Sequence, residues 1–250
     1  MTLAGCGEDS PASPGRFGEV TSAVVLVNPV INQGSSTSIE PGGARSGVAF
    51  RAEDLPVVET DASGMALVEH LPTGTVTLDF DPGTYSFQVS QEKELYDLAL
   101  SYRDGTVQAL FPPVRYPLGG TVVELEPGES IAQAAASDGT ILLLKEGSYP
   151  GDFELRAEGV LIFGAWSPTE GPLSIIEGDV TVLGGSSRMR GVHVNGRLTS
   201  NANGFSMAFS DIASATITGN GVTLLRNRFT SGQATVPSTN AILVDNLGIP

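Results

Sequence analysis

Three residues near the end of the chain carry side chains that could perform acid–base chemistry on an acidic substrate. His193, Asp211 and Arg228 are separated by 18 and 17 residues, and Asn246 follows after another 18. An imidazole and a carboxylate can move a proton to or from a bound substrate, and a guanidinium binds a carboxylate through paired hydrogen bonds. The three can act together only if the fold stacks residues that are far apart in the sequence.

The repeat pattern of the same region predicts such stacking. A phrase of one apolar residue, four mostly polar or small residues and a second apolar residue recurs in steps of 18, 17 and 18 residues. Its opening residues are Met189, Met207, Leu224 and Ile242. The region is rich in Gly, Asn, Ser and Thr and lacks helical spacing of apolar residues. A short, constant period is typical of a β-solenoid, here with about 18 residues in each rung.

In a solenoid whose rungs are in register, equivalent side chains stack about 4.8 Å apart. One predicted column is a mostly polar ladder at a corner, which would bind backbone groups of the turns: Val192, Ser210, Asn227 and Asp245. The other column faces outward and contains His193, Asp211, Arg228 and Asn246. Ordinary surface ion pairing also produces such a column, and exposed pairs contribute only ~0–1 kcal/mol. No second carboxylate stacks beside Asp211, as an inverting glycoside hydrolase would need.

Composition predicts an all-β chain that does not bind nucleic acid. Its 250 residues include 31 Gly and 16 Pro, and only 16% of them are charged. Gly and Pro disfavour helices and suit turns. The net charge of −15 disfavours binding to phosphate backbones and to anionic lipid surfaces. The charge is uneven, because residues 179–250 hold three Asp and five Arg (+2), which leaves −17 for residues 1–178.

Residues 19–128 alternate short strand-like runs with turn signals, at the spacing of an antiparallel β-sandwich. Within this part, residues 60–67 (TDASGMAL) and 71–75 (LPTGT) resemble the signature of transthyretin-like and collagen-adhesin B-type modules. Those families usually place Tyr where this chain has Val76. The resemblance implies a transthyretin-like or immunoglobulin-like sandwich that serves as a spacer or a binding platform.

Residues 129–250 begin with a helical turn, residues 129–137 (ESIAQAAAS), which Ser130 could cap and which would cover the first rung. Residues 138–151 (DGTILLLKEGSYPG) and 159–164 (GVLIFG) resemble the opening rungs of pectin-lyase-like right-handed parallel β-helices. That superfamily includes lyases, hydrolases, esterases, adhesins and inert scaffolds, so the resemblance implies a fold and no particular activity. A left-handed hexapeptide helix or a bactofilin-like polymer also suits so short a rung. The Gly and Tyr of residues 138–151 belong to the opening sequence of the right-handed class, so we favour the right-handed form.

We therefore expect an all-β protein with an N-terminal antiparallel β-sandwich, residues 19–128, followed by a short right-handed parallel β-helix, residues 129–250. The turn-rich pattern stops and the solenoid phrase starts near residues 126–129. Each part then has its own core, and we expect separable domains with few contacts across the junction.

Residues 1–18 carry a further resemblance. Leu3-Ala4-Gly5-Cys6 resembles the lipobox of bacterial lipoproteins, and Cys6 is the only cysteine of the chain. Residues 7–18 (GEDSPASPGRFG) lack apolar periodicity and would form a flexible tether. The resemblance implies cleavage before Cys6, diacylation of this cysteine and attachment to a membrane. Gly7 after the cysteine implies the outer membrane of a bacterial envelope.

These patterns favour a non-catalytic, surface-anchored lipoprotein that binds or scaffolds at the cell envelope, with a glycan or an envelope protein as partner. The alternative is a lyase or glycoside hydrolase on acidic polysaccharide, with His193, Asp211 and Arg228 as catalytic candidates. Trp166 could stack on a sugar or pack beneath its own loop. The sequence contains no zinc-type His/Cys set, P-loop or dinucleotide fingerprint, so we expect no cofactor and no metal.

The end of the repeat leads to one more expectation. Only residues 248–250 follow the last phrase, and three residues cannot cover a rung. An uncovered rung exposes unpaired backbone N–H and C=O groups, which template further strand pairing. We expect the C-terminal rung to be covered by a second copy of the chain or by a partner protein.

Overall fold

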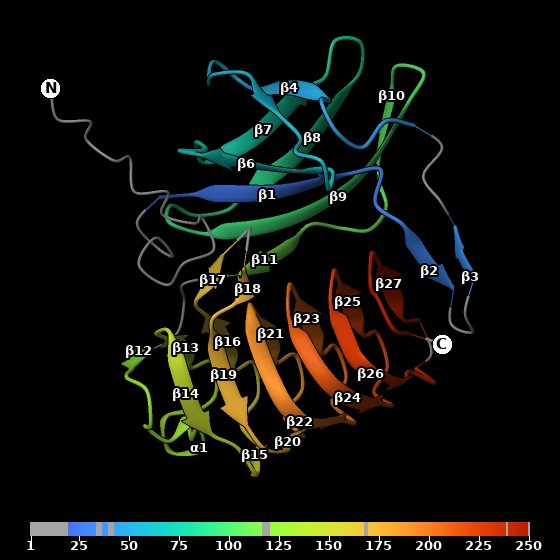
Figure 1. Cartoon of the computed structure of the whole chain (residues 1–250). Coiled ribbons are helices and arrows are strands. Elements are labelled where there is room, and N and C mark those ends of the chain that lie inside the picture. The colour runs from blue at the N-terminus through green and yellow to red at the C-terminus, as the bar shows by residue number, and fades with distance from the viewer. Residues whose placement is uncertain are drawn as a thin grey trace, which may run out of the picture.

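The computed structural model describes residues 20–33, 37–39, 43–116, 121–167, 170–238 and 240–249. The described residues form 27 strands and one short helix, which confirms the prediction of an all-β protein (Figure 1). Among them, no helix has the length and apolar character needed to cross a membrane. Cys6 and the predicted tether lie outside the described residues.

Two sheets make up the N-terminal part. The first has the strand order β10-β9-β1-β6, with β11 also paired to β9. Its strands are β1 (Ser22–Val27), β6 (Met65–Glu69), β9 (Leu95–Arg103), β10 (Thr106–Ala109) and β11 (Val114–Tyr116). β1 is parallel to β9 and antiparallel to β6. Every residue of β1 is buried, as expected for a central strand covered on both faces.

The second sheet of this part has the order β5-β4-β7-β8 and is antiparallel. Its strands are β4 (Ala49–Ala52), β5 (Val58–Glu59), β7 (Gly74–Asp79) and β8 (Thr84–Val89). In β4 exposed and buried residues alternate, so one face points to the core. That core includes Phe50, Leu78 and Phe87 from this sheet and Val25 and Leu98 from the first.

The rest of the chain, apart from a short antiparallel pair of β17 (Trp166–Ser167) and β18 (Gly171–Pro172), forms a stack of parallel strands in register. We call it the parallel stack. One of its sheets runs through β12 (Val122–Leu125), β13 (Ile141–Leu144), β16 (Leu161–Gly164), β21 (Arg188–Arg190), β23 (Ser206–Ala208), β25 (Thr223–Leu225) and β27 (Ile242–Val244). β12 pairs with β13 and not with the N-terminal sheets, so the stack begins earlier in the chain than the helical turn.

Most of the predicted register is correct, and the last rung differs by one residue. Met189 pairs with Met207, and Met207 pairs with Leu224, as the repeat predicts. Leu224 then pairs with Leu243 and not with Ile242. Leu243 belongs to the core of the stack, whereas Ile242 packs on the outer side against the N-terminal part. The loop before β27 is therefore one residue longer than the constant period implies.

A second set of parallel strands closes the stack. It contains β14 (Gly147–Pro150), β15 (Phe153–Leu155), β19 (Ser174–Glu177), β20 (Val180–Val182), β22 (Val192–Ser200), β24 (Asp211–Ile217) and β26 (Arg228–Thr235). Register shifts within β22, β24 and β26 mark the places where each rung turns. The enclosed core is mainly aliphatic, with Ile162, Val194 and Ile212 fully buried.

The predicted helical cap is present at the start of the stack. Helix α1 (Ile131–Ala134) is a single turn, and the Ser130 hydroxyl accepts a hydrogen bond from the Gln133 N–H at 3.3 Å. Ile131 is fully buried in the core of the stack. The cap therefore covers apolar side chains that the first rung would otherwise expose.

The N-terminal part packs directly on the parallel stack, which corrects the expectation of few contacts between them. A buried apolar cluster takes residues from both: Val24, Leu26, Leu95, Phe111 and Tyr116 from one side, and Leu143, Leu161, Phe163, Phe209 and Leu225 from the other. Figure 1 shows β1, β9 and β11 lying along the β13–β27 sheet. The outer face of that sheet is mostly apolar, as expected for a face that is buried against the N-terminal part.

The end of the stack near the C-terminus is covered on one sheet by the chain itself. After β1 the chain crosses to the stack and forms β2 (Ile31–Gln33), and β3 (Thr37–Ile39) pairs back on β2. Ile31 of β2 pairs antiparallel with Val244 of β27 (Figure 1). The expectation that no other part of this chain covers the last rung is therefore wrong for this sheet, because a segment more than 200 residues earlier supplies the strand.

Candidate functional site

The predicted outward column forms through its first three members. His193 is in register with Asp211, and Asp211 is in register with Arg228. Leu247, and not the expected Asn246, bridges to Arg228 because of the longer last rung. Arg228 Nε donates to Asp211 Oδ1 at 3.1 Å, and Nη2 contacts Oδ2. Both oxygens of the carboxylate are thus occupied, which leaves Asp211 poorly placed to accept a proton from a substrate.

A shallow pocket of about 220 Å³ adjoins this column. Its lining combines two aromatic residues with four charged ones: Trp166, Phe209, Glu170, Asp211, Arg226 and Arg228. Trp166 is only 7% exposed and meets Phe209 edge to face, with ring centroids 5.4 Å apart. The Trp166 side chain therefore mainly packs against its neighbours in the interior. Arg228 pairs with Asp211, and Arg226 Nε lies 3.7 Å from the Asp245 carboxylate, so the pocket does not concentrate charge of one sign.

Among the residues that the structure describes, no three His, Cys, Asp or Glu side chains gather closely enough to hold a metal ion.

The predicted corner ladder is present, with a different last member. Ser210 Oγ accepts from the Val192 N–H at 3.2 Å, and Asn227 Oδ1 accepts from the Ser210 N–H at 3.2 Å. Asn246, not Asp245, comes next: its Oδ1 accepts from the Asn227 N–H at 2.9 Å. Asn227 Nδ2 donates to the Met207 carbonyl and Asn246 Nδ2 to the Leu224 carbonyl. The ladder thus provides hydrogen-bond partners for buried backbone groups at this corner.

The ladder also explains why three bulky residues adopt a left-handed backbone. Phe209, Arg226 and Asp245 have φ values of 50°, 54° and 56°, and each directly precedes a ladder residue. This conformation is unfavourable for residues with a Cβ. It turns the N–H of the following residue toward the next rung. There Asn227 Oδ1 accepts from the Ser210 N–H, and Asn246 Oδ1 accepts from the Asn227 N–H.

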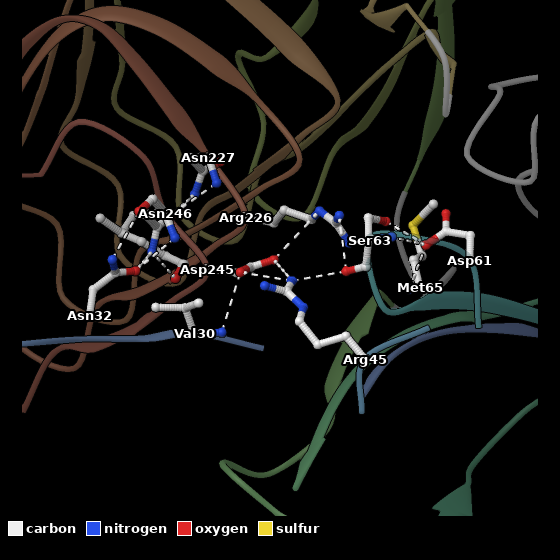
Figure 2. Close-up of polar contacts among 11 residues, drawn as sticks. Val30, Asn32, Arg45, Asp61, Ser63, Met65, Arg226, Asn227, Asp245 and Asn246 are labelled. Atoms are coloured by element: carbon white, nitrogen blue, oxygen red, sulfur yellow. Dashed lines mark hydrogen bonds and ion pairs between the residues drawn. The ribbon is translucent and has the colours of Figure 1, made fainter. Parts of the chain in front are cut away.

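Asp245 is the centre of an ionic network where the N-terminal part meets the last rung (Figure 2). Arg45 Nη2 contacts Asp245 Oδ1 at 3.1 Å and Oδ2 at 3.0 Å, and it also donates to the Ser63 carbonyl at 2.8 Å. The Val30 N–H donates to Asp245 Oδ1 at 3.3 Å. Burial lowers the pKa of the nearby Arg226, although the Asp245 carboxylate favours its charged form. One carboxylate thus joins three separate segments of the chain.

A second ion pair lies at the centre of the buried interface. Arg190 Nε and Nη2 donate to Asp97 Oδ2 and Oδ1 at 3.1 and 3.0 Å, and neither side chain is exposed. The Tyr116 hydroxyl donates to Asp97 Oδ2 at 2.6 Å. The Arg190 guanidinium lies over the Phe209 ring, 4.5 Å from its centroid. Burial, with the negative charge of Asp97, raises the pKa of Tyr116 well above its usual range.

Comparison of this chain with protein-family models, with curated proteins and with solved structures finds no match.

Proposed function

We propose that the chain is a non-catalytic, surface-anchored lipoprotein that serves as a binding or scaffolding module at a bacterial cell envelope. In this proposal the N-terminal part is a transthyretin-like or immunoglobulin-like β-sandwich, and the parallel stack is a right-handed parallel β-helix. Cys6 carries the lipid anchor, the location is the outer membrane, and the partner is a glycan or an envelope protein.

The Asp97–Arg190 pair is the observation that supports this role most directly. Both side chains of this ion pair are fully buried, and the pair joins the two parts of the molecule. A solvent-accessible site with unpaired acid–base groups would favour catalysis, but Arg228 occupies the carboxylate of the best candidate, Asp211. Rigid joining of two β modules suits a protein that presents surfaces at a fixed geometry.

The anchor is tested by mass spectrometry of the protein purified from its natural host. The expected result is a lipidated N-terminal cysteine at Cys6, because two acyl chains give stable membrane attachment. An unmodified Cys6, or a Cys6 still preceded by Gly5, would reject this part of the proposal.

A carbohydrate-active enzyme is the second candidate, and the pocket beside Asp211 is the observation that favours it. An ultraviolet assay for unsaturated uronates, run over a panel of acidic polysaccharides, distinguishes the non-catalytic proposal from a lyase. The non-catalytic proposal predicts no turnover. Turnover that Arg228→Ala abolishes and Arg197→Ala retains would establish a lyase, since Arg197 is an exposed arginine of β22 outside the pocket.

A further inference from the structure

Residues 30–33, which we call the strap, take the place of a further rung. In the ladder, Asn246 Oδ1 accepts two hydrogen bonds from Asn227, one from its backbone N at 2.9 Å and one from its Nδ2 at 3.0 Å. Asn32 Oδ1 accepts the same two hydrogen bonds from Asn246, one from its backbone N at 2.7 Å and one from its Nδ2 at 3.2 Å. The strap runs antiparallel to β27, yet its asparagine continues the ladder of the stack (Figure 2).

The strap is attached mainly through polar contacts. Asn32 Nδ2 donates to the Asn246 carbonyl at 2.9 Å, and the Val30 carbonyl accepts from the Asp245 N–H at 2.6 Å. Val30 and Ile31 are half-buried, and neither belongs to a buried apolar cluster of the described residues. Segments with little buried apolar surface open at a lower free energy than the core of a protein. The strap can therefore leave β27 without unfolding the stack.

An open strap creates two complementary surfaces on one molecule. The β27 edge then exposes backbone groups that favour pairing with another strand, and the strap exposes the asparagine that fits them. A strap from a second copy makes the same hydrogen bonds as the chain's own strap, which is the condition for exchange of an element between protomers. We propose that two copies of this chain associate by exchanging straps, each strap docking on β27 of the other copy. The closed strap blocks this association in the monomer. The proposal does not depend on the ligand or on the anchor.

Cysteine cross-linking tests the exchange in full-length protein carrying Cys6→Ser, which removes the only native cysteine. Ile31→Cys and Val244→Cys are placed in register across the strap contact, where Cα atoms of paired strands are close enough for a disulfide. The double variant should form a disulfide within one chain. The two single variants are then mixed at high protein concentration, opened with mild denaturant, returned to buffer and oxidised.

The expected product of the mixture is a disulfide-linked species of twice the monomer mass, detected by non-reducing electrophoresis and mass spectrometry. The matched control pairs Ile31→Cys with Thr216→Cys, an exposed position on β24 that the strap does not contact. Exchange predicts a large excess of cross-linked dimer over this control. Equal yields in the two mixtures, while the double variant closes within one chain, would overturn the proposal. Failure of the double variant to close would overturn it as well, because the strap would then not lie on β27.

Discussion

Asp97 and Arg190 lie 93 residues apart in the sequence and form a two-point ion pair that no solvent reaches. Asp97 belongs to β9 of the N-terminal part and Arg190 to β21 of the parallel stack. Their contact, with Tyr116 as a third partner, fixes the two parts in one relative position.

Asp97→Asn should destabilise the protein by about 3–5 kcal/mol, because it leaves the Arg190 charge buried without a partner. Urea unfolding followed by circular dichroism measures the loss. The matched control is Asp104→Asn, which makes the same chemical change in an exposed pair with Arg103 and should cost roughly 0–1 kcal/mol. Equal effects of the two substitutions would show that the buried pair is not important for stability.

Asn227→Ala should cost about 1–3 kcal/mol, because it strands the Ser210 N–H and the Met207 carbonyl in the interior. Asn195→Ala is the control, since this exposed amide only reaches Glu177 on the surface. Thermal unfolding of both variants provides the comparison. A loss no greater for Asn227→Ala than for Asn195→Ala would contradict a structural role for the ladder.

Alkaline pH should reduce stability through buried tyrosines. Burial raises the pKa of Tyr149 to about 12, and that of Tyr116 is also raised by burial. The unfolded chain loses these protons near pH 10, before the folded protein does. Stability is therefore complete below pH 10 and declines as the pH rises from 10 toward 12. Unfolding free energies across this range test the slope, which Tyr149→Phe should make shallower. An unchanged slope would exclude Tyr149 as a contributor.

Asp245→Asn should loosen the end of the stack locally, because it removes the charge that Arg45, Arg226 and the Val30 N–H share. Hydrogen exchange should accelerate at Val244 and Asn246, while the amides of β13 at the other end keep their rates. Uniform acceleration along the stack would indicate global destabilisation and contradict a local role for Asp245.

The sequence predicted the stacked rungs because their apolar residues recur with an almost constant period. Met189, Met207 and Leu224 were placed correctly, and the single extra residue before β27 shifted the assignment of Ile242, Asp245 and Asn246. A loop insertion leaves the apolar phrase intact, so the period alone cannot reveal it.

The residues that join the two parts were missed for a different reason. Asp97 stands in the otherwise apolar run of β9, and such an isolated charge in a buried strand was a signal that it has a partner. Nothing in the local pattern identifies Arg190 as that partner. The strap was missed because β2 has three residues, too few to show alternation.

The strap also has a consequence for how the protein is made. Asn32 leaves the ribosome 214 residues before Asn246, the residue that it binds. Until those 214 residues have been synthesised the strap has no docking site, so it cannot make these contacts when it first emerges. Contacts between such distant residues form slowly, because a long loop must close before they stabilise anything. Closure of the strap should therefore be a late event in the folding of each new chain, and crowded nascent chains would be most able to exchange straps in that interval.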